Sequence, residues 1–176
     1  AGERGLQLRS LDDYWRMAQC VSSSGLAPKG LEKPEAALIA MQLGAEIGLP
    51  PLASLQQIAV INGRPSIYGD AQLGVVRGTG ELERFDEWVE GAGKRATRTP
   101  AEFTDDTAAV CLVKRRGYPE TQDSFSVKDA KRAGLWGKAG PWSQYPARML
   151  RFRARSFILR DQFGDALRGL RTVEEN

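Results

Sequence analysis

The segment PARMLRFRARSFILRDQF, residues 146–163, constrains the fold most, because it carries five arginines among seven large apolar side chains. At about 100° per residue, the apolar positions of a helix through this segment fall on two roughly opposite faces. A helix that is apolar on two sides is held between two bodies. One body is expected to be the chain's own sheet, and the other is either a second subunit or a further element of the same chain. The first face holds Tyr145, Met149, Phe152, Ser156, Leu159 and Phe163, and the second holds Ala147, Leu150, Ala154, Phe157 and Ile158.

The arginines form two stripes between these apolar faces. Arg148, Arg151 and Arg155 make one stripe, and Arg153 and Arg160 make the other. At the edges of the two faces, arginines can pair with carboxylates or line a groove that follows a phosphate backbone. Both interpretations stay open for each arginine, although the second stripe is expected to flank the apolar faces rather than fill them.

Charge is distributed unevenly along the sequence. Residues 1–90 hold 8 basic and 12 acidic side chains, whereas residues 91–176 hold 17 basic and 10 acidic ones. Of the 25 basic residues 18 are arginine, which suits bidentate phosphate contact and stacking on bases. The second half is therefore a candidate surface for a polyanion.

Several classes of function are disfavoured by residues that the sequence lacks. It has no histidine, the commonest general base and metal ligand, so a serine, cysteine or zinc hydrolase is not expected. The segments GAGKR at 91–95 and GTGELE at 78–83 fail the patterns of nucleotide-binding loops, so no cofactor is expected. Cys20 and Cys111 show no CxxC spacing, and no run of 18 apolar residues occurs. These features predict a cytoplasmic protein without a disulfide scaffold, signal peptide or membrane span.

Helices are predicted at five places. Ser10 with Asp13, and Ser126 with Asp129, have the spacing of capping boxes, and Pro34 suits the first position of a helix. Asp70 is the expected cap of a short helix that ends near Gly78. Residues 44 and 48 are glycines, which invites close packing of another element. The predicted helices cover about residues 10–24, 34–48, 70–78, 126–136 and 143–167.

Strands are predicted on both sides of Asn62-Gly63, the strongest short signal of a β-hairpin. Residues 81–91 and 107–116 are also expected to form strands, with a basic end at residues 114–116. Residues 91–106 are predicted to be a loop, and residues 117–124 a turn or loop. The expected fold is α+β, with a small antiparallel sheet and a hairpin packed against the long helix.

The segment GPWSQYPARMLRFRARSFILRDQF resembles the C-terminal core motif of the phage single-strand annealing proteins, the RecT and lambda Red-beta family. Three further segments match this family: PEAALIAMQLGAEIGLPPLASLQQIAVINGRPSIYGD, CLVKRRGYPE and FSVKDAKRAGLWGK. The resemblance covers about residues 30–170. It implies an N-terminal helical segment at 1–30, an annealing core at 31–171 and a tail at 172–176.

This resemblance also implies a function. Such proteins anneal complementary single-stranded DNA without ATP, form rings and helical filaments on DNA, hold an annealed duplex intermediate and work with a 5′–3′ exonuclease. Their fold resembles that of the eukaryotic Rad-type annealing proteins. The implied place of action is the cytoplasm of a bacterial host.

Candidate DNA contacts follow from the matched positions and from the basic pattern. Ala147 stands where Red-beta has a lysine, so that contact is either missing or made by Arg148. The alternatives are a DNA-processing nuclease and an oligomeric interaction domain that uses its arginines for salt bridges between subunits. The candidate residues are Gln56, Gln57, Arg64, Lys114, Arg115, Arg116, Trp142, Arg148, Arg151, Arg153 and Arg160.

Overall fold

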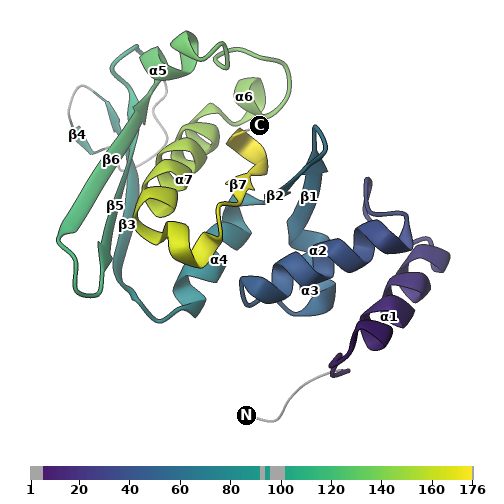
Figure 1. Cartoon of the computed structure of the whole chain (residues 1–176). Coiled ribbons are helices and arrows are strands. Elements are labelled where there is room, and N and C mark those ends of the chain that lie inside the picture. The colour runs from purple at the N-terminus through teal and green to yellow at the C-terminus, as the bar shows by residue number, and fades with distance from the viewer. Residues whose placement is uncertain (1–5, 92–93, 96–101, 176) are drawn as a thin grey trace.

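The computed structural model describes residues 6–91, 94–95 and 102–175 of the chain. The molecule is elongated, with the N-terminal helices at one end and a four-stranded sheet, covered by the long helix α7, at the other (Figure 1). The fold is α+β, as predicted, and its helices and strands form two sheets and two apolar cores.

Three helices form the N-terminal end: α1 (Leu11–Ser23), α2 (Pro34–Glu46) and α3 (Pro51–Gln57). The predicted capping box of Ser10 and Asp13 begins α1. Helix α3 was not predicted, because Pro50 and Pro51 were interpreted only as the end of α2. Pro51 instead occupies the first turn of a new helix, where its missing N–H is not needed. These helices share the smaller core, which consists of Ala18, Leu31, Ala37, Ala40, Met41, Leu55 and Ile58.

Close approach of α2 and α3 depends on Gly44. A Cβ atom at residue 44 would lie 1.8 Å from Ser54 Oγ, so only glycine fits there. The prediction of close packing is thus confirmed at Gly44. Gly48 meets nothing within 4 Å and instead has a positive φ of 81°, which ends the helix.

The hairpin follows α3 directly. Strands β1 (Ile58–Ile61) and β2 (Arg64–Ile67) are antiparallel, and positive φ angles at Asn62 and Gly63 make the predicted tight turn. A short strand, β7 (Arg171–Thr172), adds to β2 in parallel and leads into the 3-10 turn η1 (Val173–Glu175). The predicted boundary between core and tail, at residues 171 and 172, therefore falls inside β7.

The second sheet has the order β4-β3-β5-β6 and is antiparallel throughout. Its strand β6 corrects the prediction of a turn or loop over residues 117–124. Within this range the predicted turn is confirmed only around Gly117, which has a positive φ. The strand was missed because its sequence, ETQDSFS, is almost wholly polar and lies on an exposed sheet edge. Part of the predicted loop 91–106 is strand, at β4, and residues 92–93 and 96–101 lie outside the described residues. The strands are β3 (Leu82–Gly91), β4 (Lys94–Arg95), β5 (Ala108–Arg115) and β6 (Glu120–Ser126).

Four further helices connect and cover the sheets: α4 (Gly69–Gly78), α5 (Val127–Arg132), α6 (Pro141–Gln144) and α7 (Pro146–Leu167). The predicted capping box of α5 is present. The prediction that Asp70 caps α4 is wrong, since Tyr68 is the cap residue and Glu174 accepts the N–H of Gly69 at 3.1 Å. Residues 143–145 do not belong to α7, because Tyr145 precedes a proline and cannot keep helical geometry.

Both apolar faces of α7 are covered within the chain. On one face, Phe157 packs edge-on against Phe125 of β6, with ring centroids 5.8 Å apart. On the other, Ser156 lies 3.1 Å from the Thr172 hydroxyl of β7, and the ring of Phe152 approaches Gly69 of α4. The prediction of a helix held between two bodies is confirmed, and the second body is a further element of the same chain.

Candidate nucleic-acid interface

The structure distributes the predicted DNA contacts over separate places. Trp142, Arg148 and Arg153 meet at a pocket beside the start of α7. Lys114, Arg115 and Arg116 lie at the end of β5, where Arg115 contacts the last turns of α7. The remaining predicted contacts are Gln56 and Gln57 at the end of α3, Arg64 at the start of β2, and Arg151 and Arg160 along α7.

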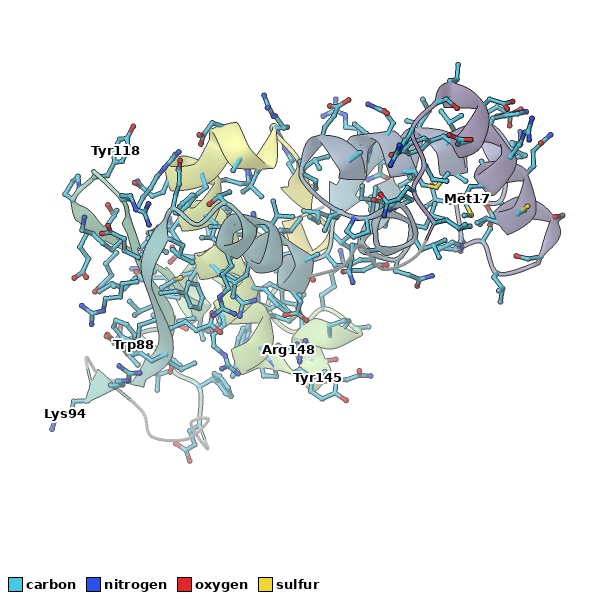
Figure 2. All side chains as sticks on the ribbon, turned by 90° about the horizontal axis from the view of Figure 1, so that it is seen from below. Met17, Trp88, Lys94, Tyr118, Tyr145 and Arg148 are labelled. Carbon is cyan, nitrogen blue, oxygen red and sulfur yellow. The ribbon has the colours of Figure 1, made fainter. Side chains whose placement is uncertain are left out.

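The pocket has a volume of about 500 Å³ and lies between α6, the start of α7, the end of the hairpin and the turn η1. Aromatic side chains form much of its wall, and the residues Tyr68 and Tyr145 are 42% and 62% exposed. In Figure 2, Tyr145 and Arg148 lie close together on one side of the molecule. The residues that line the pocket are Tyr68, Leu135, Lys138, Ala139, Pro141, Trp142, Tyr145, Arg148, Met149, Phe152, Arg153, Val173 and Glu174.

Arg153 is part of the pocket wall and is only 9% exposed. The expectation that it flanks the apolar faces of α7 is therefore wrong. Arg160, two turns further along the helix, is half-buried. Replacing Arg153 would disturb packing as well as charge, so its substitution cannot isolate a contact with a phosphate.

The first arginine stripe lies against carboxylates of the same chain. Arg155 is 10% exposed and donates two hydrogen bonds to Glu87, from Nε at 2.9 Å and from Nη2 at 2.6 Å. It also lies 3.4 Å from Asp70, which Arg148 contacts at 3.1 Å. For Arg148 and Arg155, the interpretation as carboxylate partners is confirmed, and the carboxylates belong to the same chain.

Arg151 differs from its two neighbours on the stripe. It lines the same small polar recess as Asp70, Glu87, Arg148 and Arg155. Yet within the described part of the chain no side chain or carbonyl group forms a hydrogen bond or ion pair with its guanidinium. Arg151 is therefore the arginine of this stripe whose charge is available to an external anion.

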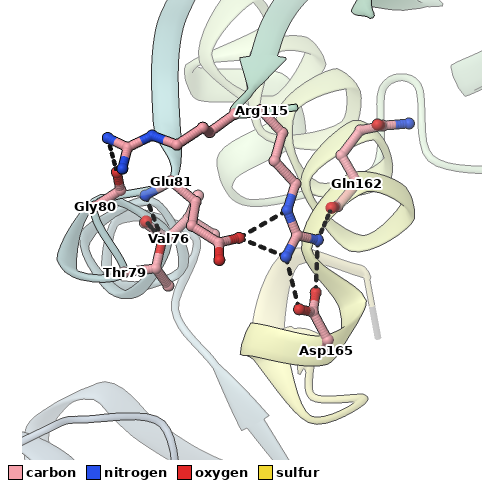
Figure 3. A network of polar contacts seen from close by, with 8 residues as sticks. Val76, Thr79, Gly80, Glu81, Arg115, Gln162 and Asp165 are labelled. Atoms are coloured by element: carbon pink, nitrogen blue, oxygen red, sulfur yellow. Dashed lines mark hydrogen bonds and ion pairs between the residues drawn. The ribbon is translucent and has the colours of Figure 1, made fainter. Parts of the chain in front are cut away.

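Arg115 has all five guanidinium N–H groups engaged (Figure 3). Its Nε and Nη2 atoms contact Glu81, while Nη1 and Nη2 donate to the two carboxylate oxygens of Asp165 at 2.8 and 2.7 Å. Nη1 also donates to the carbonyl of Gln162 at 2.6 Å. These hydrogen bonds hold the pKa of Asp165 at about 2. Arg115 therefore joins β5 to the end of α7, and leaves no donor for a phosphate.

The neighbours of Arg115 are partly engaged as well. Lys114 lies 3.3 Å from Glu83, and its Nζ donates to the carbonyl of Tyr118. Arg116 donates to the carbonyl of Gly80 at 3.1 Å and keeps an exposed guanidinium. Of the predicted basic strand end, Arg116 is the residue that remains most accessible.

Ion pairs between the two halves of the chain offset part of the charge asymmetry of the sequence. Acidic residues that follow α4 or belong to β3 pair with basic residues from the second half of the chain. The pairs are Glu81 with Arg115, Glu83 with Lys114, Asp86 with Arg95, and Glu87 with Arg155. The predicted polyanion surface is therefore narrower than the sequence indicates, and the pocket with its neighbouring cations is its best-defined part.

Three residues of the pocket rim were missed by sequence reasoning: Tyr68, Lys138 and Tyr145. Tyr145 was assigned to an apolar face of α7, but its ring turns outward because the helix begins one residue later. The Pro146 that follows it was the signal for this break. For Tyr68 and Lys138 the sequence holds no comparable signal, because segments far apart in the chain bring them to the pocket.

Two further findings concern possible metal ligands and the buried thiol among the described residues. No group of three or more His, Cys, Asp or Glu side chains among them could hold a metal ion. Burial is the main cause that raises the pKa of the Cys111 thiol to about 12.

Within the described ranges no single helix is long and apolar enough to cross a membrane. Helices α2 and α3 together have sufficient apolar length, but they meet at 104° and supply much of the smaller core.

Comparison of the chain with protein-family models, curated proteins and solved structures finds no match.

Proposed function

We propose that this chain binds single-stranded DNA and anneals complementary strands without ATP, the function that its resemblance to the RecT and Red-beta proteins implies. One observation carries the proposal. Trp142, Arg148 and Arg153 come together at one pocket, beside exposed tyrosines and near Arg151, which has no ion-pair partner within the described part of the chain. Aromatic faces beside cations are what sequence-tolerant binding of single strands uses.

Annealing makes modest chemical demands. Cations neutralise the repulsion between two polyanionic strands, and contacts to the backbone leave base edges free to test pairing. No catalytic group is required. The proposal includes the wider expectations of the resemblance: a Rad-type fold, a ring or filament of identical subunits, an exonuclease partner and action in the bacterial cytoplasm.

An annealing assay without nucleotide tests the function. Two complementary oligonucleotides, one with a fluorophore and one with a quencher, are mixed at low salt with and without the protein. We expect the protein to accelerate annealing and to bind each strand with little sequence preference. Failure to bind either strand at low salt would contradict the proposal and favour the interaction domain. Cleavage of the labelled strands on addition of Mg²⁺ would contradict it in favour of a nuclease.

A further inference from the structure

We propose that the pocket between α6 and α7 receives one unstacked base of a bound strand, while the adjacent phosphates stay outside on Arg148 and Lys138. This inference rests on the proposed binding of single-stranded DNA. It assigns the pocket to the base and not to the phosphate, and it identifies Tyr145 as the residue on which the base stacks.

The size and walls of the pocket suit an aromatic ligand. Its volume of about 500 Å³ lies within the roughly 300–1,000 Å³ typical of small-molecule sites. Phe152, Met149 and Val173 give it an apolar interior, and Trp142, 7% exposed, closes one side. An apolar and aromatic cavity favours the flat face of a base over a hydrated phosphate.

A carboxylate in the wall also disfavours a phosphate inside the pocket. Glu174 lines it and is fixed in place, because it accepts the backbone N–H of Gly69 at the start of α4. Its negative charge would repel a phosphate placed beside it, and it offsets the positive charge that Arg153 brings to the same wall. A base carries no such charge, and its amino and imino groups can donate to carboxylate oxygens.

The rim of the pocket carries a tyrosine, Tyr145, that is largely exposed to solvent. Tyr145 is 62% exposed and occupies the cap position of α7, with φ −136° and ψ 54°. Its position is set by the backbone, since Pro146 begins the helix at the next residue. Tyr68 supplies a second partly exposed ring, from the end of β2. Rings held by backbone and left open to solvent are suited to stacking with bases.

Cations flank the opening where phosphates of the same strand would lie. Arg148 pairs with Asp70 at 3.1 Å, but the two side chains are 58% and 68% exposed, so this ion pair is weak and can be exchanged for a phosphate. Lys138 lies on the pocket lining, and Arg151 is one turn along α7 from Arg148. The arrangement therefore separates an apolar interior for a base from a basic rim for its backbone.

The test compares a strand with bases to a strand without them. Fluorescence anisotropy measures the affinity for oligothymidylate and for an abasic strand with the same number of phosphates. The variants are Tyr145→Leu, which removes the ring, and Tyr145→Phe, which keeps it. Tyr118→Leu is the matched control, because Tyr118 is a similarly exposed tyrosine on the turn between β5 and β6, far from the pocket (Figure 2).

We expect the unmodified protein to prefer oligothymidylate over the abasic strand by roughly tenfold or more, the size of one stacking contact. Tyr145→Leu should lose most of this preference, whereas Tyr145→Phe and Tyr118→Leu should keep it. Equal affinity of the unmodified protein for both strands overturns the inference, as does an unchanged preference in Tyr145→Leu. Absence of binding to either strand would instead contradict the proposed function itself.

Discussion

At the scale of single residues, the arginines of this chain differ in whether a carboxylate of the same chain already binds their guanidinium group. Arg115 and Arg155 are enclosed by carboxylates from distant segments, and their guanidinium groups join β5 or α7 to the rest of the core. Arg151, on the same helix as Arg155, has no such partner in the described part of the chain. Residue type alone does not separate these roles.

Substitution of Arg155 and of Arg151 should therefore have opposite effects. Arg155→Ala leaves the carboxylate of Glu87, whose side chain is only 17% exposed, without its partner, and we expect it to lower the free energy of unfolding by about 3 kcal/mol. Arg151→Ala should leave that energy nearly unchanged and weaken binding to single-stranded DNA by roughly tenfold, the loss of one charge-assisted contact. Denaturant unfolding and fluorescence anisotropy measure the two quantities. A stable Arg155→Ala protein together with a destabilised Arg151→Ala protein would reverse the assignment.

The ion pair of Arg115 with Asp165 predicts a dependence of stability on pH. Hydrogen bonds from Arg115 hold the pKa of Asp165 at about 2 in the folded chain, below its ordinary value of 3.8. A carboxylate with a lowered pKa stabilises the fold above its unfolded pKa, and this contribution is lost as the pH falls through the folded value. We expect the stability difference between the unmodified protein and Asp165→Asn to be full at pH 5 and to shrink between about pH 4 and pH 2. Urea unfolding across this range measures it, and a difference that grows toward low pH would contradict the assignment.

At the scale of elements, helix packing depends on single small residues. Gly44 lets α2 lie against Ser54 of α3, where a Cβ would come 2.4 Å from the Ser54 Cβ. This contact is between rigid parts of two helices, so it cannot be relieved by rotation of a flexible side chain.

Gly44→Ala should therefore destabilise the N-terminal end of the molecule. We expect the free energy of unfolding to fall by about 1–3 kcal/mol, as for other overpacked cores. Gly74→Ala in α4 is the matched control, because its Cβ would meet nothing within 4 Å, and alanine favours the helix by roughly 0.5–1 kcal/mol. Thermal unfolding of both variants gives the comparison. A Gly44→Ala protein as stable as Gly74→Ala would mean that α2 and α3 can separate at little cost.

At the scale of the whole molecule, the two covered faces of α7 change the argument for assembly. The sequence predicts oligomers because the second apolar face of α7 has to be buried. In the structure β7 and α4 already cover that face. Rings or filaments remain a prediction from the resemblance, and light scattering with and without complementary oligonucleotides tests it. The large exposed apolar side chains lie mostly at the N-terminal end, among them Leu11, Leu26, Ile39 and Leu52.

Binding by a narrow basic surface predicts a moderate dependence on salt. Each phosphate neutralised on a single strand contributes about −0.7 to the slope of log affinity against log salt concentration. Contacts by Lys138, Arg148 and Arg151 give a slope of about −2, and Arg151→Ala should reduce its magnitude by about 0.7. Anisotropy titrations at several salt concentrations measure both slopes. A flat dependence would show that phosphates do not carry the binding.

Much of the fold was predictable because its signals are local. Capping boxes at Ser10 and Ser126, the Asn62-Gly63 turn and the periodicity of α7 each depend on neighbours a few residues apart. Strand β6 and helix α3 were missed for local reasons too, since a polar edge strand and a helix begun by two prolines resemble loops.

The pocket could be predicted only in part. The sequence predicted Trp142, Arg148 and Arg153 as DNA contacts. It did not predict Tyr68, Lys138 and Glu174, which line the same pocket.

The amino-acid sequence is enough to show that the long helix is apolar on two sides and carries two arginine stripes, because side-chain direction along a helix follows from its period. What covers those two faces, and which arginines are already paired with carboxylates, depends on how distant segments pack. Asp70 lies 78 residues before Arg148, and Glu87 lies 68 residues before Arg155. Ion pairs over such separations depend on how strands and helices pack, and a favourable partner for an arginine is any nearby carboxylate. The charge that remains for a nucleic acid is therefore a property of the fold and not of the composition.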